Sequence, residues 1–536
     1  MAAPPVLQPA APAAPAAQPI PWLGLVAVLL GTFISTLNGR LGSVGLADIR
    51  GGVHATFDDG AWITTAQTAA QMLIAPIAIW VGGMYGPRRA LIVAAAAFAV
   101  TSFLEPFSIN LQTLLAMQFL GGLASGFFVP LTLSFILKST PPRYWAYGIA
   151  LYALNLELSL NIASSLEGFY ADHSWAWIFW QNVPLAVGMV LCLHFGVPRD
   201  APIPNRPRAD IFGLATCGLG LALVYAALDQ GNRLDWLNSG VVVGLLTSGA
   251  VLLAGFLIHE RRSAHPFVNL DVLYADPLPR LLILVSFLRL TILSTAFLIP
   301  QYLGAVRGFR ALEVGQTLIW IAAPQLIICP LAGLTLRRSD PRLVASIGFI
   351  FIAIACLSVA HGLTPLWGSD QFLPSQLLQA VGQSFALSGV LFFGILHLRP
   401  QDALTFGAAV QVARLMGGEI GTAFVTTMNR ICAQIASNSI GQNVRVGDLA
   451  VVQRMQALGA VTGRTGADPT AGLSRGANLL AASVRQAAAT QAVIDVFVIM
   501  AGLTAVALIL AVAHRPAPLG PASHRPLFGN RAGLAQ

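Results

Sequence analysis

Apolar runs of about 20 residues, separated by short polar or basic stretches, recur along the whole chain. A helix rises about 1.5 Å per residue, so a run of this length crosses a hydrocarbon layer about 30 Å thick. The pattern therefore predicts an all-α polytopic membrane protein with fourteen spans. We expect them at 22–47, 61–83, 90–108, 113–138, 145–169, 176–196, 210–228, 239–259, 279–303, 313–336, 342–362, 371–396, 405–429 and 491–513.

The stretch from Tyr144 to Ala186 shows the pattern most clearly. Its first apolar run carries Glu157 near the middle and Glu167 near the end. A short polar break follows, and then a tryptophan-rich segment, 175–184, at the depth where lipid meets water, which tryptophan favours. A charge inside a membrane helix is costly, so these acids are candidates for function.

Composition agrees with a membrane protein: charged residues make up 10%, hydrophobic residues 56%, and the mean hydropathy is +0.72. Soluble proteins carry about 25% charged residues. The five cysteines lie in or beside apolar runs without paired spacing, and the nine histidines are scattered, so we predict neither disulfides nor a metal site. No phosphate-binding loop or nucleophile motif is present, and we expect neither an enzyme nor a cofactor.

The net charge of +8 would suggest a nucleic-acid partner in a soluble protein, but here it marks the loops on one side of the membrane. If the N-terminus lies inside, fourteen basic residues of the short loops are cytoplasmic and four are outside. The long outer segment 430–490 carries six more arginines, but long loops largely escape this rule. We therefore expect both termini in the cytoplasm and no nucleic-acid partner.

Three arginines remain inside the predicted spans, and the acids within spans include three glutamates of the same regions. A polar interior cavity explains them, since unpaired charges in lipid cost several kcal/mol. The functional interpretation is a path for substrate or protons, and the alternative is structural pairing between helices. With two nearby amides, the candidates for the substrate cavity are Asn38, Arg40, Asn155, Arg289 and Arg414, and those for proton coupling are Glu157, Glu419 and Glu167.

A faint internal repeat links two short basic loops. The loop between the second and third spans contains Gly86, Arg88 and Arg89, and the loop between the tenth and eleventh contains Asp340 and Arg342. The two loops occupy corresponding places if spans 1–6 and 9–14 are duplicated halves, the usual build of secondary transporters. We expect both loops to act in gating.

Four motifs are specific in order and spacing: Trp175–Pro184, Leu228–Gly231 with Leu234–Trp236, His265–Leu270, and Arg414–Gly421 after Pro400–Asp402. With them, the chain resembles the fourteen-helix drug:proton antiporter branch of the major facilitator superfamily, of the EmrB/QacA kind. The resemblance implies two six-helix bundles, two linking helices, and multidrug efflux by alternating access in a bacterial inner membrane. Its implied partners are amphipathic substrates, protons, membrane lipid, a periplasmic adaptor protein and an outer-membrane channel.

The chain departs from this family at several positions. Asn38 stands where the family has a first-span acid, Gly83 where it has a loop acid, and Gln118 where it has a fourth-span arginine. Glu419 replaces a small polar residue. These departures favour a relocated proton site, with Glu157 as the principal carrier, and a fixed Glu157–Arg40 bridge is the alternative.

The expected organisation is a disordered tail (1–21), a first bundle (22–200), two linking helices (201–278), a second bundle (279–513) and a cytoplasmic tail (514–536). Within the second bundle, residues 430–490 form either a solvated, partly disordered loop or a short amphipathic helix whose face is Leu449, Val452, Met455 and Leu458. The expected function is proton-coupled export of hydrophobic or amphipathic compounds. A non-transporting membrane sensor or scaffold and an uptake facilitator are the alternatives.

Overall fold

The computed structural model describes residues 22–199, 210–263, 274, 276–398, 402–445, 447–462 and 469–516. Every regular element in this part of the chain is a helix. The expected tail 1–21, the segment 265–270 and most of the C-terminal tail lie outside it.

The first bundle contains six spanning segments joined by short turns. Pro76 lies within the second and Pro130 in the second half of the fourth. The fourth span is built from two consecutive helices, α6 and α7. Its helices are α1 (Trp22–Val44), α2 (Leu46–Gly52), α3 (Phe57–Gly60), α4 (Trp62–Tyr85), α5 (Pro87–Leu104), η1 (Glu105–Phe107), α6 (Leu111–Ser125), α7 (Phe128–Ser139), η2 (Pro142–Tyr144), α8 (Trp145–Ala171), α9 (Trp177–Trp180) and α10 (Asn182–Gly196).

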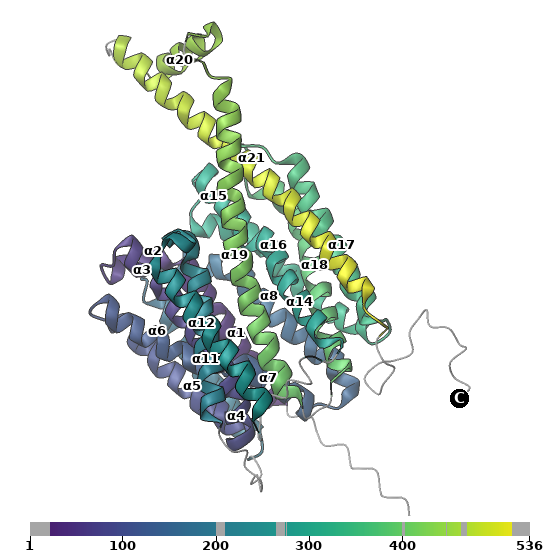
Figure 1. Ribbon diagram of the computed structural model, residues 1–536. Coiled ribbons are helices and arrows are strands. Elements are labelled where there is room, and N and C mark those ends of the chain that lie inside the picture. The colour runs from purple at the N-terminus through teal and green to yellow at the C-terminus, as the bar shows by residue number, and fades with distance from the viewer. Residues whose placement is uncertain are drawn as a thin grey trace, which may run out of the picture.

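Two linking helices and a second bundle complete the fold (Figure 1). The linking helices are α11 (Ile211–Leu234), followed by η3 (Trp236–Asn238), and α12 (Gly240–Arg262). The second bundle consists of α14 (Leu278–Leu293), the π-turn η4 (Ser294–Leu298), α15 (Ile299–Arg307), α16 (Ala311–Leu336), α17 (Pro341–Gly362), α18 (Ser369–Leu396), α19 (Ala403–Gln442), α20 (Leu449–Thr462) and α21 (Pro469–Ala513).

Thirteen helical segments of the described chain are long and apolar enough to span a membrane, where the sequence predicts fourteen. The difference is α19, whose Gln411, Arg414 and Glu419 lower its mean hydropathy. This helix still runs through the molecule, in contact with α14, α21, α7 and α4 (Figure 1). The protein is therefore a multi-pass membrane protein with one polar helix among its apolar ones.

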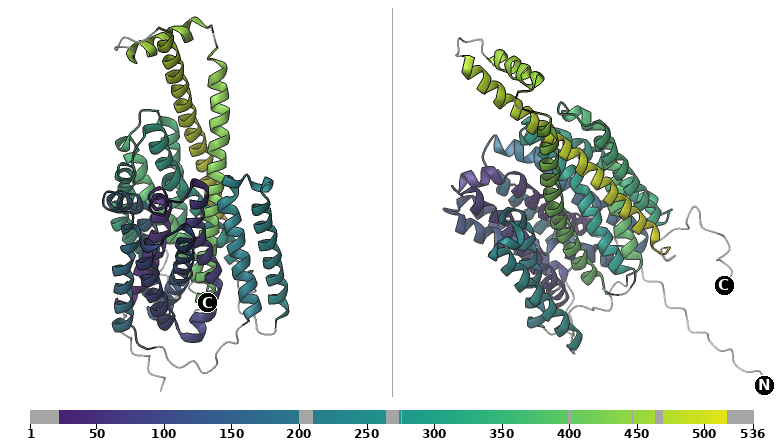
Figure 2. Two further views of the ribbon diagram at one scale, coloured as in Figure 1. Left: turned by 90° about the vertical axis from the view of Figure 1, so that its left-hand side faces the viewer. Right: turned by 45° about the horizontal axis from the view of Figure 1, so that its top comes forward.

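The helices α19 and α21 extend far beyond the bundles as an antiparallel pair, with α20 across their tip (Figures 1 and 2). Their lengths of 40 and 45 residues exceed the roughly 20 that a membrane requires. In the described part, the expectation of a partly disordered loop at 430–490 is wrong, because continuous helix extends from each span. The short helix expected at 449–458 is confirmed as α20, and its Val452, Met455 and Leu458 are half-buried.

The sequence contains Gly-xxx-Gly spacings at Gly122–Gly126, Gly240–Gly244 and Gly417–Gly421, and close helix contacts occur at the first and the third. Gly122 packs α6 against the backbone of α4 at Gln67, and Gly417 packs α19 against α14 at Ser286. At Gly240 and Gly244 of α12 no neighbouring group lies within 4 Å of the Cβ position, so this spacing makes no helix contact.

The two bundles meet along α8, which packs on α16 and α18, and along α7, which packs on α19. The linking helix α11 lies beside this seam and contacts both α4 of the first bundle and α19 of the second. This position places α11 next to the junction of the two bundles, where a substrate site is expected.

Candidate functional site

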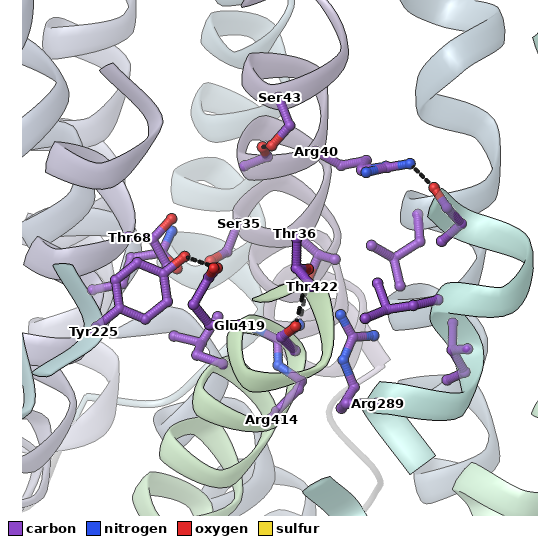
Figure 3. A pocket seen from close by; sticks show the side chains of 18 residues that line it. Ser35, Thr36, Arg40, Ser43, Thr68, Tyr225, Arg289, Arg414, Glu419 and Thr422 are labelled. Atoms are coloured by element: carbon purple, nitrogen blue, oxygen red, sulfur yellow. Dashed lines mark hydrogen bonds between the residues drawn. The ribbon is translucent and has the colours of Figure 1, made fainter. Parts of the chain in front are cut away.

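A polar cavity of about 160 Å³ lies between the two bundles, at the level where Arg289 and Arg414 face α1 (Figure 3). Six α-helices and the π-turn η4 contribute to its wall: α1, α4 and α8 from the first bundle, α14, η4 and α19 from the second, and the linking helix α11. The polar side chains on the wall are Ser35, Thr36, Arg40, Ser43, Thr68, Gln71, Tyr225, Arg289, Arg414, Glu419 and Thr422.

Arg414 is buried on α19 and joins the two bundles. Its guanidinium donates hydrogen bonds to Gln411 Oε1, at 2.8 and 3.2 Å, and to Thr36 Oγ1 of α1 at 3.2 Å. These partners are neutral oxygens, so no contact ion pair cancels the positive charge of Arg414 among the described residues.

The other two arginines of the cavity differ in how they are held. Arg40 of α1 donates to the carbonyl of Ala296, within the π-turn η4 of the second bundle (Figure 3). In Arg289 of α14, Nε and Nη1 have no hydrogen-bond partner among the described residues. A buried guanidinium with free N–H groups beside a cavity is suited to bind an anionic or strongly accepting group.

Glu157 is fully buried at the middle of α8, and neither carboxylate oxygen has a hydrogen-bond partner within the described chain. Its electrostatic partners are Arg289 and Arg414, which belong to the opposite bundle. No ion pair joins Glu157 to Arg40 among the described residues, so the fixed bridge weighed from the sequence is not formed. The carboxyl group of Glu157 is within electrostatic range of two arginines, but no hydrogen bond or ion pair to a described residue holds it in place.

Glu419 lies on the cavity wall and accepts a hydrogen bond from the hydroxyl of Tyr225 at 3.0 Å (Figure 3). It shares α19 with Arg414, but the two side chains do not pair. Nothing in the sequence marks Tyr225, which is one aromatic residue in an apolar linking helix. Only the packing of α11 against α19 brings its hydroxyl to the cavity.

Hydrogen bonds made by residues 229–232 hold α11 beside the polar cavity. Gln230 Nε2 donates to Thr65 Oγ1 of α4 at 2.6 Å, and Thr65 donates to Asp229. On the other side, Asn232 Nδ2 donates to the carbonyl of Ala423 at 3.0 Å and its Oδ1 accepts from Thr427 of α19 at 2.7 Å. Successive residues of one motif thus bind α11 to both bundles.

Three predicted site residues lie away from this cavity. Asn38 faces α10, where its Oδ1 accepts a hydrogen bond from Asn182 at 2.6 Å, and Asn155 donates to Leu151 of its own helix at 2.8 Å. Glu167, near the end of α8, lies close to the exposed Asp48 of α2 and does not line the cavity.

A network of buried amides joins the bundles beside the cavity. Asn161 of α8 donates to Gln325 of α16 at 3.3 Å and to Gln383 of α18 at 3.4 Å. Gln383 in turn donates to Thr295 of the π-turn at 3.0 Å. π-turns are frequent at functional sites, and this one also accepts the contact from Arg40.

In each half, one arginine of the predicted gating loop donates to backbone carbonyls at the end of the sixth span of that half. Arg88, at the start of α5, donates to the carbonyls of Leu193 and His194 at the end of α10, at 3.2 and 3.0 Å. Arg342, at the start of α17, donates to the carbonyl of His514 at the end of α21 and to Asp340. The third span is thus tied to the sixth in both halves, as an internal repeat predicts.

The remaining loop residues have distinct positions. Gly86 adopts φ 87°, a backbone conformation that favours glycine, at the turn between α4 and α5. Arg89 follows Arg88 on α5 and lies beside Tyr85. Asp340 caps α17 by accepting a hydrogen bond from the backbone N–H of Arg342 at 2.9 Å.

Comparison with known proteins decides the family. The sequence profile of the Major Facilitator Superfamily matches residues 28–422, which is well over half of the chain. The chain belongs to the Major Facilitator Superfamily. It is accordingly a secondary transporter by family, not an enzyme.

Similar curated proteins include bacterial proteins named for export or resistance. The chain is 24% identical over 404 residues to the "Multidrug export protein EmrB" of Escherichia coli, a match covering 75% of this chain and 79% of that protein. It is 23% identical over 410 residues to the "Fatty acid resistance protein FarB" of Neisseria gonorrhoeae, covering 74% of this chain and 79% of the relative. The expected EmrB-like membership is confirmed.

Solved structures confirm the fold. The human organic anion transporter MFSD10 superposes with a TM-score of 0.56 at 15% identity, covering 92% of this chain and 100% of its own. The proton:xylose symporter XylE superposes with a TM-score of 0.52 at 11% identity, covering 77% and 89%. At these identities the likeness concerns the fold alone.

Proposed function

We propose that this protein exports hydrophobic or amphipathic compounds by alternating access and that proton entry drives the export. The observation that carries the proposal is the buried charged set at the junction of the bundles: Arg289 and Arg414 on one side and Glu157 on the other. Such charges are costly inside a membrane protein and are found where substrates or protons pass. The names of the relatives, which describe multidrug export and fatty acid resistance, also support an export function.

Glu157 is the proposed proton carrier because its charge acts between the bundles. When the carboxyl group is ionised, it attracts Arg289 and Arg414 and favours the arrangement in which α8 lies close to α14 and α19. Protonation removes that attraction and favours separation of the bundles at this depth. A proton that binds and leaves therefore shifts the equilibrium between two arrangements, which is what alternating access requires.

Glu419 and Glu167 have different places in this proposal. Glu419 is on the cavity wall, where it contacts substrate or receives the proton after Glu157. Glu167 does not line the cavity and carries no step of the cycle.

Transport by the purified protein tests the proposal. We reconstitute it in liposomes with an imposed pH gradient and follow a panel of acidic, neutral and cationic amphipathic dyes. Gradient-dependent accumulation of at least one dye, abolished by a protonophore, is the expected result. Equilibration without a gradient would identify a facilitator, and binding without movement of any dye would identify a sensor; either result contradicts the proposal.

The proposed location is the inner membrane of a bacterium, with both termini in the cytoplasm, and the projecting pair α19–α21 then extends into the periplasm. Exposed apolar side chains on α19 and on α20 at its tip, among them Ile431, Ile435 and Leu449, are available to a periplasmic adaptor protein of an outer-membrane channel. Cross-linking from a photoreactive residue at position 435, with position 350 on the lipid-facing surface of α17 as control, tests this contact. Equal cross-linking from both positions contradicts an adaptor site on the hairpin.

A further inference from the structure

A second cavity lies beside the linking helices, and its wall is apolar. It has a volume of about 360 Å³, within the range of pockets that hold small organic molecules. Side chains from both bundles and from both linking helices line it, among them Ile79, Cys217, Leu221, Phe256, Ala409 and Val412. None of the described residues that line it carries a charged side chain.

The apolar cavity and the polar cavity are lined by successive turns of the same helices. On α11, Cys217 and Leu221 face the apolar cavity and Tyr225, one turn further, faces the polar one. On α19, Ala409 and Val412 face the apolar cavity, and Leu415 and Glu419 continue the same stripe into the polar cavity. Leu282 and Arg289 of α14 are related in the same way.

This arrangement places two chemically different cavities, a polar end and an apolar end, one after the other along the same helices. The polar end has three guanidinium groups on its wall against one carboxyl group, and Arg289 keeps N–H groups without partners. The apolar end extends over residues 405–413 of α19, which is about 12 Å of helix. A ligand complementary to both ends carries an anionic head and a hydrocarbon chain.

We propose that the apolar cavity holds the hydrocarbon chain of an amphipathic carboxylate whose head group binds Arg289 and Arg414. The proposal rests on the proposed function, since it takes this ligand to be a compound that the protein exports. The linking helices are then part of the substrate site: α11 and α12 form the wall that receives the chain, and Tyr225 stands where the chain ends and the head begins.

Binding of a chain-length series tests the proposal without any transport. The purified protein, in phosphatidylcholine nanodiscs, is titrated with butanoate, hexanoate, octanoate, decanoate and dodecanoate, and empty nanodiscs supply the background. Affinity should rise about fourfold for each added methylene that enters the cavity. Dodecyltrimethylammonium, which has the same chain and a cationic head, should bind at least tenfold more weakly than dodecanoate.

Two cavity variants and one control locate the chain. Ala409→Phe fills the apolar cavity and should abolish the gain in affinity from octanoate to dodecanoate while butanoate binds as before. Leu221→Ala enlarges the cavity and should increase the gain for the longest chains. Val251→Phe, on the lipid-facing side of α12 where Val251 is 70% exposed, should behave as the wild type.

Arg289→Gln tests the head-group contact and should weaken all five carboxylates by about the same factor. If Ala409→Phe, Leu221→Ala and Val251→Phe share one chain-length profile, the apolar cavity holds no chain and the proposal is overturned. Equal binding of carboxylate and ammonium also overturns it. A protein that binds dodecanoate as expected but transports nothing contradicts export alone, so the two failures are distinguishable.

Discussion

The hydroxyl of Tyr225 donates a hydrogen bond to Glu419 across the boundary between a linking helix and the second bundle, at 3.0 Å. The contact makes α11 a part of the polar cavity, because Glu419 lies on the wall of that cavity and Tyr225 beside it (Figure 3). A helix that merely connected two bundles would not need a buried polar contact of this kind.

Tyr225→Phe tests the importance of this contact, because it removes the hydroxyl and keeps the ring. Glu419 then loses its hydrogen-bond donor, and a bond to a charged group contributes about 1.5–3 kcal/mol. We expect a several-fold lower transport rate in liposomes with a normal elution profile. Tyr144→Phe, at a half-buried tyrosine of η2 away from the cavity, is the control, and an equal rate in both variants would show that the contact is not used.

Arg414→Ala should destabilise the protein and reduce transport. The substitution removes three hydrogen bonds made by a charged donor, and each such bond contributes about 1.5–3 kcal/mol. Thermal unfolding in detergent measures the loss, and Arg414→Lys should restore part of it by keeping the charge. Arg485→Ala, on the exposed hairpin, should unfold at the wild-type temperature.

Glu157→Gln keeps the shape of the side chain but cannot take up a proton. It should fold normally and bind dodecanoate at least as tightly as the wild type, because no carboxylate competes for Arg289. Accumulation driven by a pH gradient should be lost across pH 6 to 8. Asp370→Asn, at an exposed acid, is the control. If Glu157→Gln accumulates substrate as the wild type does, Glu157 is not the proton carrier and Glu419 is the next candidate.

Asn161→Leu should weaken the connection between the bundles. The variant removes the donor that binds Gln325 and Gln383 across the seam, so the bundles should separate more readily. The measurement is the rate at which a cysteine at position 35, on the cavity wall, reacts with a small thiol reagent, and we expect a several-fold increase. Asn155→Leu is the matched control on the same helix, since that amide bonds only within α8; equal rates would exclude a role for the amide network.

The orientation is tested with single cysteines in a cysteine-free background. Asn438→Cys, on the projecting part of α19, should react with an impermeant thiol reagent applied to intact cells. Ser339→Cys, between α16 and α17, should react only after the membrane is opened. The reverse pattern would contradict the orientation predicted from the arginines.

The spans, the family and the identity of the buried charges are determined by the sequence. Hydropathy is a local property, so each apolar run predicts its own helix, and a charge such as Arg289 inside a run is visible without any tertiary contact. The one span that this property describes poorly is α19, because the residues that form the site lower its hydropathy.

The pairing of those charges was decided only by the tertiary structure. Helix rotation and bundle packing determine which side chains meet. They turn Asn38 toward α10 and separate Glu419 from Arg414. They also leave Glu157 within electrostatic range of Arg289 and Arg414 rather than paired with Arg40. The place of Tyr225 depends on contacts between residues about 200 positions apart. No pattern within a single helix specifies such a contact, because the free energy that selects it comes from the packed interface of three helices.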